Sequence, residues 1–154
     1  MKRIVLLGTG LALVTAAVFA QDKPPFEMEI KARQGLMSIN ALNIGILYKM
    51  SRGDTPYDAV AAKSAADAIV GVYNLDLPML WPEGSDNTTN PATRAQPTIW
   101  DQSSSIGEKA KAWETAALAM QAAAGADQAS LKAAFPALDQ ACSGCHKAFR
   151  AAAN

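Results

Sequence analysis

Four stretches of the chain repeat apolar residues at steps of three and four, which is the spacing of one face of an α-helix. The first follows Pro24-Pro25 and reaches about residue 50, and the others cover about residues 57–73, 99–124 and 128–152. The alternation of apolar and polar positions that is typical of strands is absent from the sequence. We therefore expect an all-α protein, an antiparallel four-helix bundle with two short links and one long link.

Each stretch has one face that we expect to point inward. The first of these faces contains two polar residues, Arg33 and Asn40, and an inward Arg is costly unless it is paired. Arg33 therefore either meets an anion or packs its stem at the rim of the bundle with its head group in water. In chain order, the four faces comprise Phe26, Ile30, Arg33, Met37, Asn40, Ile44 and Leu47; Val60, Ser64, Ala68 and Val72; Ile106, Ala110, Trp113, Ala117, Met120 and Ala124; and Leu131, Phe135, Leu138, Cys142, Cys145 and Phe149.

Residues 51–56 carry the signals for a helix end followed by a helix start. Gly53 is expected to end the first helix, because glycine readily adopts the left-handed conformation of a C-cap. Asp54 or Thr55 is then expected to cap the second helix, with Pro56 at its first helical position.

The other breaks differ in length. Residues 125–127 form a short link, whereas residues 74–97 are rich in Pro, Gly and Asn and form one long connection. Loops of this length in a compact domain are usually functional or wrap an edge of the structure. Pro136 lies inside the fourth stretch and predicts a kink or a break there, because proline cannot donate the backbone hydrogen bond of a helix.

The N-terminus has the pattern of a secretory signal peptide. Lys2 and Arg3 precede an apolar run over residues 4–13, and small residues follow. The run is short for a membrane span, so an uncleaved signal anchor is the less favoured alternative. We expect cleavage of residues 1–20, which leaves residues 21–154 as one domain without a membrane anchor, exported to the periplasm of a Gram-negative bacterium.

The charge of the mature chain points to no polyanionic partner. Because Lys2 and Arg3 leave with the signal, 12 basic residues remain against 14 acidic residues. This balance favours neither nucleic acid nor an anionic membrane surface.

The chemistry of the chain is concentrated in residues 142–146, which read C-S-G-C-H. C-x-x-C-H is the attachment signature for c-type haem. Two thiols one helical turn apart can add to the two vinyl groups on neighbouring corners of the porphyrin, and the adjacent imidazole then lies beneath the iron. We expect one covalent haem c per chain, attached through Cys142 and Cys145, with His146 as an axial iron ligand.

Three other interpretations of this motif are weaker. A thioredoxin-like dithiol belongs in a strand-helix-strand context that the chain lacks. A structural zinc site needs four ligands, and His146 is the only histidine. A plain disulfide between Cys142 and Cys145 would not require the neighbouring histidine.

The single histidine also limits the sixth coordination position of the iron. Ligation by two histidines of one chain is impossible, so this position is left to Met, Lys, water, an external ligand or no ligand.

With the C-x-x-C-H motif at 142–146, the sequence resembles the class II c-type cytochromes, the family of cytochrome c′ and cytochrome c-556. The sequence C-S-G-C-H-K-A-F-R at 142–150 is similar to the family's C-x-x-C-H-x-x-[YF]-R ending. Further similarities cover the expected mature chain, namely R-Q-G-L-M at 33–37, T-P-Y-D-A at 55–59, W-P-E-G-S-D at 81–86 and P-T-I-W at 97–100.

The resemblance implies roles for residues outside the C-x-x-C-H motif. Arg33 and Gln34 resemble family residues at the haem edge, where the Arg pairs with a propionate. Ser85 and Asp86 would lie in the loop near the same edge. Met37 occupies the position whose side chain faces the iron on the side opposite the histidine.

Three further residues have expected roles, and two positions depart from the family pattern. Arg150, one turn beyond the histidine, either meets a propionate or is solvated at the helix end. Phe149 and Trp113 are expected to be core or haem-packing residues. The sequence departs from the pattern at Pro136, where many relatives have Gly, and at Trp81, which is bulkier than its usual counterparts.

Met37 separates two hypotheses for the function. If its thioether ligates the iron, the haem is six-coordinate and low-spin, and the protein is an electron carrier with periplasmic redox partners. If Met37 only packs over the iron, the haem is five-coordinate, and the protein binds small diatomic gases such as nitric oxide or carbon monoxide. We favour the electron carrier, with Met50, Met120 or a lysine as other possible iron ligands.

An enzyme is not expected, because the sequence offers no second histidine and no nucleophile set or carboxylate pair with a spacing that suggests acid-base work. A homodimer is expected through the small-residue face of the second helix, with Ala61, Ala65 and Ala66, together with the first helix. A monomer with a solvated Ala-rich face is the alternative.

Overall fold

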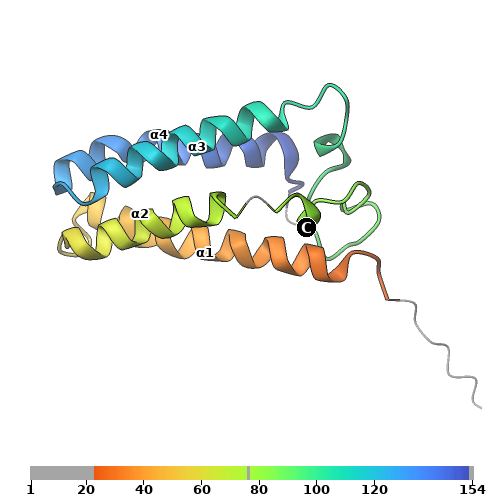
Figure 1. Ribbon diagram of the computed structural model, residues 1–154, viewed down its shortest axis with the longest axis horizontal. Helices are drawn as coiled ribbons and strands as arrows, with labels where there is room; N and C mark the ends of the chain where they lie inside the picture. The colour runs from red at the N-terminus through yellow and green to blue at the C-terminus, as the bar shows by residue number, and fades with distance from the viewer. Residues whose placement is uncertain (1–22, 76, 153–154) are drawn as a thin grey trace, which may run out of the picture.

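A computed structural model describes residues 23–75 and 77–152. Within these residues four α-helices lie side by side as an antiparallel bundle, and a long loop closes one end of it (Figure 1). The expected all-α four-helix bundle is confirmed, whereas the predicted signal peptide, residues 1–20, lies outside the described residues. The elements, in chain order, are α1 (Glu27–Arg52), α2 (Ala59–Tyr73), the 3₁₀ turns η1 (Pro78–Leu80) and η2 (Pro97–Ile99), α3 (Ile106–Ala124) and α4 (Gln128–Phe149).

Helix α1 begins and ends where the sequence predicts. It starts just after Pro24-Pro25 and ends at Gly53, which has a φ of 78°. The Gly53 N–H donates hydrogen bonds to the carbonyls of Lys49 and Met50, which satisfies part of the open helix end.

The cap of helix α2 was predicted wrongly. Neither Asp54 nor Thr55 caps it, and Pro56 lies before the helix. The cap is Asp58, whose carboxylate accepts hydrogen bonds from the N–H groups of Val60 at 2.9 Å and Ala61 at 3.0 Å. The chain is extended at Asp58, so the helix starts several residues after the turn instead of directly behind Gly53.

The inward face of α2 also differs from the expectation. Val60 is 80% exposed and Ser64 is exposed, so they do not belong to the core. The buried residues of the helix are Ala62, Ala65, Ala66, Ile69 and Val70. Val60 and Ser64 share a face of the helix with Lys63 and Asp67, which form an exposed ion pair, so this face is the polar one.

Part of the predicted dimer surface is wrong, because Ala65 and Ala66 are buried. Ala65 is 3% exposed and Ala66 is fully buried inside the bundle, so neither can form an interface with a second chain. Self-association remains a prediction, and it would have to use side chains that are exposed, such as Val60 on α2 and Leu42 and Met28 on α1.

Helices α3 and α4 correct two further expectations. Helix α3 begins at Ile106 instead of about residue 99, because Pro97 starts the 3₁₀ turn η2 and residues 100–103 form bends and a turn. Helix α4 runs through Pro136 without a break, with the proline on its exposed face, and the alternative of a kink there stays a prediction. Within the described residues no helix is long and apolar enough to cross a membrane.

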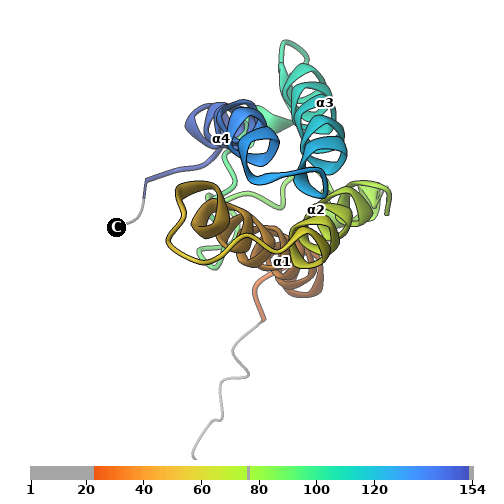
Figure 2. The same ribbon diagram turned by 90° about the vertical axis from the view of Figure 1, so that its left-hand side faces the viewer.

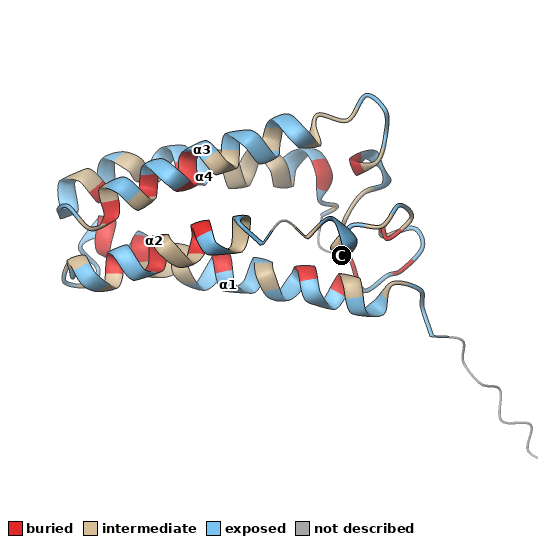
Figure 3. Ribbon diagram, viewed as in Figure 1, coloured by how far each residue is buried: buried red, intermediate tan, exposed pale blue. Residues whose placement is uncertain are grey.

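The main apolar cluster occupies the half of the bundle away from the long loop, and Figure 3 shows that further buried residues lie at the loop end. Leu47 of α1, Met120 of α3 and Leu131 and Leu138 of α4 are all fully buried in this cluster. Complete burial of such a side chain contributes about 1.5–3 kcal/mol. Small residues of α2 and α3 allow the helices to approach closely, and Figure 2 shows the four helices end-on around this core. The half of the bundle next to the long loop lies outside this cluster and is available for the functional site.

Two contacts fix how α1 and α4 are aligned. The Gln128 Nε2 donates to the Met50 carbonyl at 2.8 Å, and the rings of Tyr48 and Phe135 have centroids 5.3 Å apart. Because the helices are antiparallel and both advance about 1.5 Å per residue, residues an equal number of steps from these contacts lie level with each other. Met37 of α1 is therefore level with residues 141–146 of α4.

Candidate haem site

The C-x-x-C-H residues lie in the last turns of helix α4, at the loop end of the bundle. Cys142, Cys145 and His146 are each half-buried, and both thiols are free. Residues three and four apart share a face of a helix, so the two sulfurs and the imidazole project from one side of α4. Among the described residues no group of His, Cys, Asp and Glu side chains is arranged to hold a metal ion directly.

Burial keeps both thiols in their neutral form. It raises the pKa of Cys142, with a hydrogen bond from Trp113 acting in the opposite direction. It also raises the pKa of Cys145, against the lowering influence of the charge on Lys109. Trp113 and Lys109 are both on α3, so this helix forms one wall beside the cysteines.

His146 lies in a different electrostatic environment. Its pKa is lowered, first by burial and then by the positive charges of Arg150 and Arg94. The imidazole is consequently neutral at pH 7, and neutral imidazole is the form that ligates metals. Arg94 was missed by the sequence analysis, because nothing in the composition of the long loop shows that this residue returns to the end of α4.

A short backbone bridge brings Arg94 there. Ala95 and Arg150 form an isolated antiparallel bridge. The Gln96 N–H donates to the Phe149 carbonyl at 2.9 Å, and the Ala151 N–H donates to the Arg94 carbonyl at 2.8 Å. The loop is thus fastened directly beyond the C-x-x-C-H turn, and the exposed side chains of Arg94 and Arg150 flank His146.

Arg33 fastens the same loop to α1. It is only 3% exposed, so the alternative with its head group in water is wrong. Its Nη1 donates to the Ser85 Oγ at 2.7 Å and the Leu80 carbonyl at 3.3 Å. Its Nη2 donates to the Ser85 carbonyl and to the Thr93 Oγ1, the latter at 3.0 Å. The guanidinium carbon also lies 4.6 Å from the centre of the Trp81 ring.

This arrangement restricts what Arg33 can do for a haem. Both Nη atoms use their N–H groups on the loop, so the Nε–H is the donor that is left for a propionate. Burial lowers the pKa of Arg33 and the charge of Asp86 raises it, without removing the positive charge. Gln34 donates to the Ala92 carbonyl at 2.7 Å and so fastens the loop as well.

Ser85 and Asp86 are structural parts of the loop. Ser85 is fully buried and Asp86 is 5% exposed. The Asp86 Oδ1 accepts hydrogen bonds from the Thr88 N–H at 2.8 Å and the Thr88 Oγ1 at 2.6 Å, and these bonds lower the pKa of Asp86. Arg33, Ser85 and Asp86 thus lie near one another, together with Thr93 and Trp81, and their place at a haem edge stays a prediction.

Met37 lies on α1, level with the C-x-x-C-H turn across the bundle. Its neighbours on the same face, Arg33 and Asn40, are buried, yet Met37 is 46% exposed. The Met37 thioether is therefore not packed in the apolar core. In contrast, Met50 and Met120 are 7% and 0% exposed in the opposite half of the bundle.

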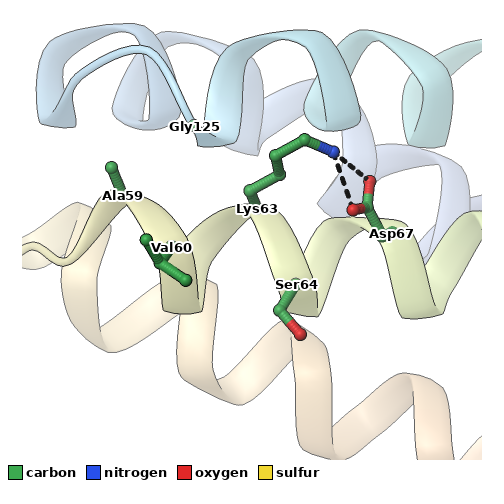
Figure 4. A pocket seen from close by; sticks show the side chains of 6 residues that line it. All are labelled: Ala59, Val60, Lys63, Ser64, Asp67 and Gly125. Atoms are coloured by element: carbon green, nitrogen blue, oxygen red, sulfur yellow. Dashed lines mark hydrogen bonds and ion pairs between the residues drawn. The ribbon is translucent and has the colours of Figure 1, made fainter.

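A surface hollow of about 390 Å³ lies elsewhere (Figure 4). It is lined by Ala59, Val60, Lys63 and Asp67 of α2 and by Gly125, with an ion pair of 2.7 Å between Lys63 and Asp67. It contains none of the candidate site residues and is separate from the C-x-x-C-H turn.

The donor set fits covalent haem c. Two free, half-buried thiols lie one turn apart beside an imidazole that is held neutral, and the α1 face at the same level presents a thioether. The same face carries a buried amide oxygen, the Asn40 Oδ1, that has no hydrogen-bond partner among the described residues. Both sides of a haem thus find suitable groups here, and the fold and site together define a c-type cytochrome of the helical-bundle class.

Comparison with known proteins identifies the family. Residues 28–150 match the family model described as Cytochrome C′, and the chain belongs to this family of class II c-type cytochromes, which carry covalent haem c. It is 37% identical over 150 residues to cytochrome c-554 of Cereibacter sphaeroides, covering 97% of this chain and 98% of the relative. It is 36% identical to cytochrome c′ of the same organism, covering 96% and 97% of the two chains.

Solved structures agree with this assignment. Cytochrome c′ from Rhodobacter sphaeroides superposes with a TM-score of 0.80 at 34% identity, covering 83% of this chain and 98% of that one. A nitric oxide complex of a cytochrome c prime mutant from Alcaligenes xylosoxidans superposes with a TM-score of 0.71 at 27% identity, covering 82% and 97%.

Proposed function

We propose that the protein is a periplasmic electron carrier whose haem is attached through Cys142 and Cys145 and ligated by His146 and Met37. The observation that carries the proposal is the alignment of α1 with α4, which puts Met37 level with the C-x-x-C-H turn. The haem supplies one-electron redox chemistry. A methionine ligand opposite a histidine raises the reduction potential of such a haem.

The protein supplies the surroundings of this group. His146 is held in the neutral form that can bind iron, and the loop that covers this end is fastened to α1 by Arg33 and to α4 by the bridge at Ala95. Two cations, Arg94 and Arg150, lie beside the histidine and can neutralise the charge of a propionate. We propose Arg33, through its Nε–H, and Gln34 as further contacts at the haem edge.

Export to the periplasm is part of the proposal. The predicted signal peptide would deliver the two free cysteines to the compartment outside the cytoplasm, and redox partner proteins would have to be found there.

The spectrum of the purified haem protein tests the ligation. We expect a low-spin, six-coordinate spectrum at neutral pH that becomes high-spin in Met37→Ala, with a lower reduction potential. Met28→Ala is the matched control, because Met28 is on the same helix and is 73% exposed. A high-spin spectrum of the unmodified protein would refute ligation by Met37. A low-spin spectrum that survives Met37→Ala would point to a lysine, since Met50 and Met120 are buried in the core.

A second function is favoured by the relatives. Solved structures of cytochrome c prime variants from Alcaligenes xylosoxidans contain bound nitric oxide. If the spectrum is high-spin, binding of small diatomic gases at the Met37 side becomes the preferred function. Titration of the reduced protein with carbon monoxide then measures this binding directly.

A further inference from the structure

Asn40 is a buried amide without a complete set of hydrogen bonds. Its side chain belongs to the inward face of α1 and is 7% exposed, and its Oδ1 has no hydrogen-bond partner among the described residues. Leaving a buried polar atom unpaired costs about 1–3 kcal/mol. A neighbour on the same helix shows the ordinary outcome, since Asn43 donates from its Nδ2 to the Ile39 carbonyl at 2.9 Å.

The position of Asn40 links it to the haem site. It is one helical turn from Met37, on the same face of α1, because residues three apart are neighbours on a helix. The alignment of α1 with α4 puts it level with residues 138–143, at the boundary between the apolar core and the C-x-x-C-H turn. Along this face of α1 the next buried residue toward the loop is Arg33 and the next toward the core is Leu47, so Asn40 lies where the face changes from polar to apolar.

We infer that the Asn40 carboxamide hydrogen-bonds to a small neutral diatomic molecule bound to the iron on the Met37 side. This inference rests on the proposed placement of the haem, and it concerns the state in which the iron is open on the Met37 side. A carboxamide carries a donor at one end and an acceptor at the other, and rotation about its last side-chain bond exchanges them. The amide can therefore turn its N–H toward the outer atom of the diatomic molecule, which is the acceptor.

The consequence is selectivity among ligands of similar size. An apolar pocket selects only by size, whereas a donor favours ligands whose outer atom accepts a hydrogen bond and gains negative charge on binding. A net hydrogen bond of about 1 kcal/mol corresponds to about a fivefold change in affinity.

Carbon monoxide is the probe for this contact, because donation to the bound molecule weakens the C–O bond and lowers its stretching frequency. The experiment uses the reduced haem protein with Met37→Ala, so that the iron is open to the ligand. In this background Asn40→Leu should raise the infrared C–O frequency and speed carbon monoxide dissociation about fivefold. Asn43→Leu, which changes the same chemical group on the same helix, should leave both unchanged.

Identical C–O frequencies and dissociation rates in Asn40→Leu and Asn43→Leu would overturn the inference. Leucine has the same branched shape as asparagine and removes an unpaired polar group, so the urea midpoint of Asn40→Leu should stay the same or rise if its larger methyl groups fit. If it falls instead, Asn40→Ala in the same background gives the readout without the added bulk. Failure of Met37 ligation is seen separately, in the spectrum of the protein before any substitution.

Discussion

The guanidinium of Arg33 holds Ser85 by both the hydroxyl and the carbonyl, across 52 positions of the sequence. The contact joins a helix to the middle of the long loop, and both residues are buried. Arg33 and Ser85 thereby hold the middle of the long loop, which has little regular structure of its own.

Arg33→Leu should lower the free energy of unfolding by about 2–4 kcal/mol, because it leaves the buried polar groups of Ser85 and Thr93 without their donor. Urea unfolding of the haem protein measures this change. Gln34→Ala is the control and should cost less than about 1 kcal/mol, because it removes one exposed hydrogen bond to the loop. Equal effects of the two substitutions would show that Arg33 does not hold the loop.

The stability of the loop should depend on pH through Asp86. Its pKa is lowered by hydrogen bonds from Thr88, so the folded state holds the carboxylate more strongly than the unfolded state does. The stabilisation is complete above the ordinary Asp pKa of about 3.9, and it is lost as the pH falls through the lowered value.

Asp86→Asn keeps an oxygen at the Oδ1 position and removes the titration. We expect the difference in unfolding free energy between the original protein and this variant to be constant from about pH 7 to pH 5 and to shrink below about pH 4. Urea unfolding at a series of pH values measures it. A difference that stays constant down to pH 2 would contradict the assignment.

Each of the two cysteines should form its own thioether bond to the haem. Cys142→Ser and Cys145→Ser should each retain haem after denaturing electrophoresis through the remaining thioether, and the double variant should lose it. Haem staining of the gel measures this. Ser143→Ala is the control, since the Ser143 hydroxyl is exposed and bonds only to the Gln140 carbonyl at 3.2 Å. Complete retention by the double variant would exclude thioether attachment.

Pro136→Ala should stabilise the protein. The helix is continuous through this exposed position, so alanine can restore the hydrogen bond to the Lys132 carbonyl that proline cannot make. The gain is reduced because proline also restricts the unfolded chain, which leaves about 1–2 kcal/mol. A thermal unfolding scan measures the shift, and a lower Tm would show that the helix is shaped around the proline.

The sequence predicts most of the helices because their signals are local. Gly53 ends α1 through its own left-handed backbone, and the apolar spacing of Leu131 and Leu138 identifies the buried face of α4. In α2 the wrong face was expected to be buried, because the spacing of Val60 and Ser64 was followed although Lys63 and Asp67 make the same face polar. The Asp58 cap was missed because Asp54 and Thr55 carry the same local signal.

The residues of the site also divide into those with a local signal in the sequence and those without one. The C-x-x-C-H motif is local and is read directly from the sequence, and the family resemblance supplied Arg33, Ser85 and Asp86. Arg94 was not found, because its approach to His146 depends on a backbone bridge between distant segments. The hydrogen bond from Arg33 to the Thr93 hydroxyl was missed for the same reason.

The bridge between Ala95 and Arg150 also bears on the order of folding. It joins residues 94–96 of the loop to the end of α4, two segments that lie far apart in the sequence. Contacts between such distant segments form late, because a long stretch of chain must be closed first. The cysteine-bearing turn therefore stays open to the attachment of haem until the loop has closed against α4.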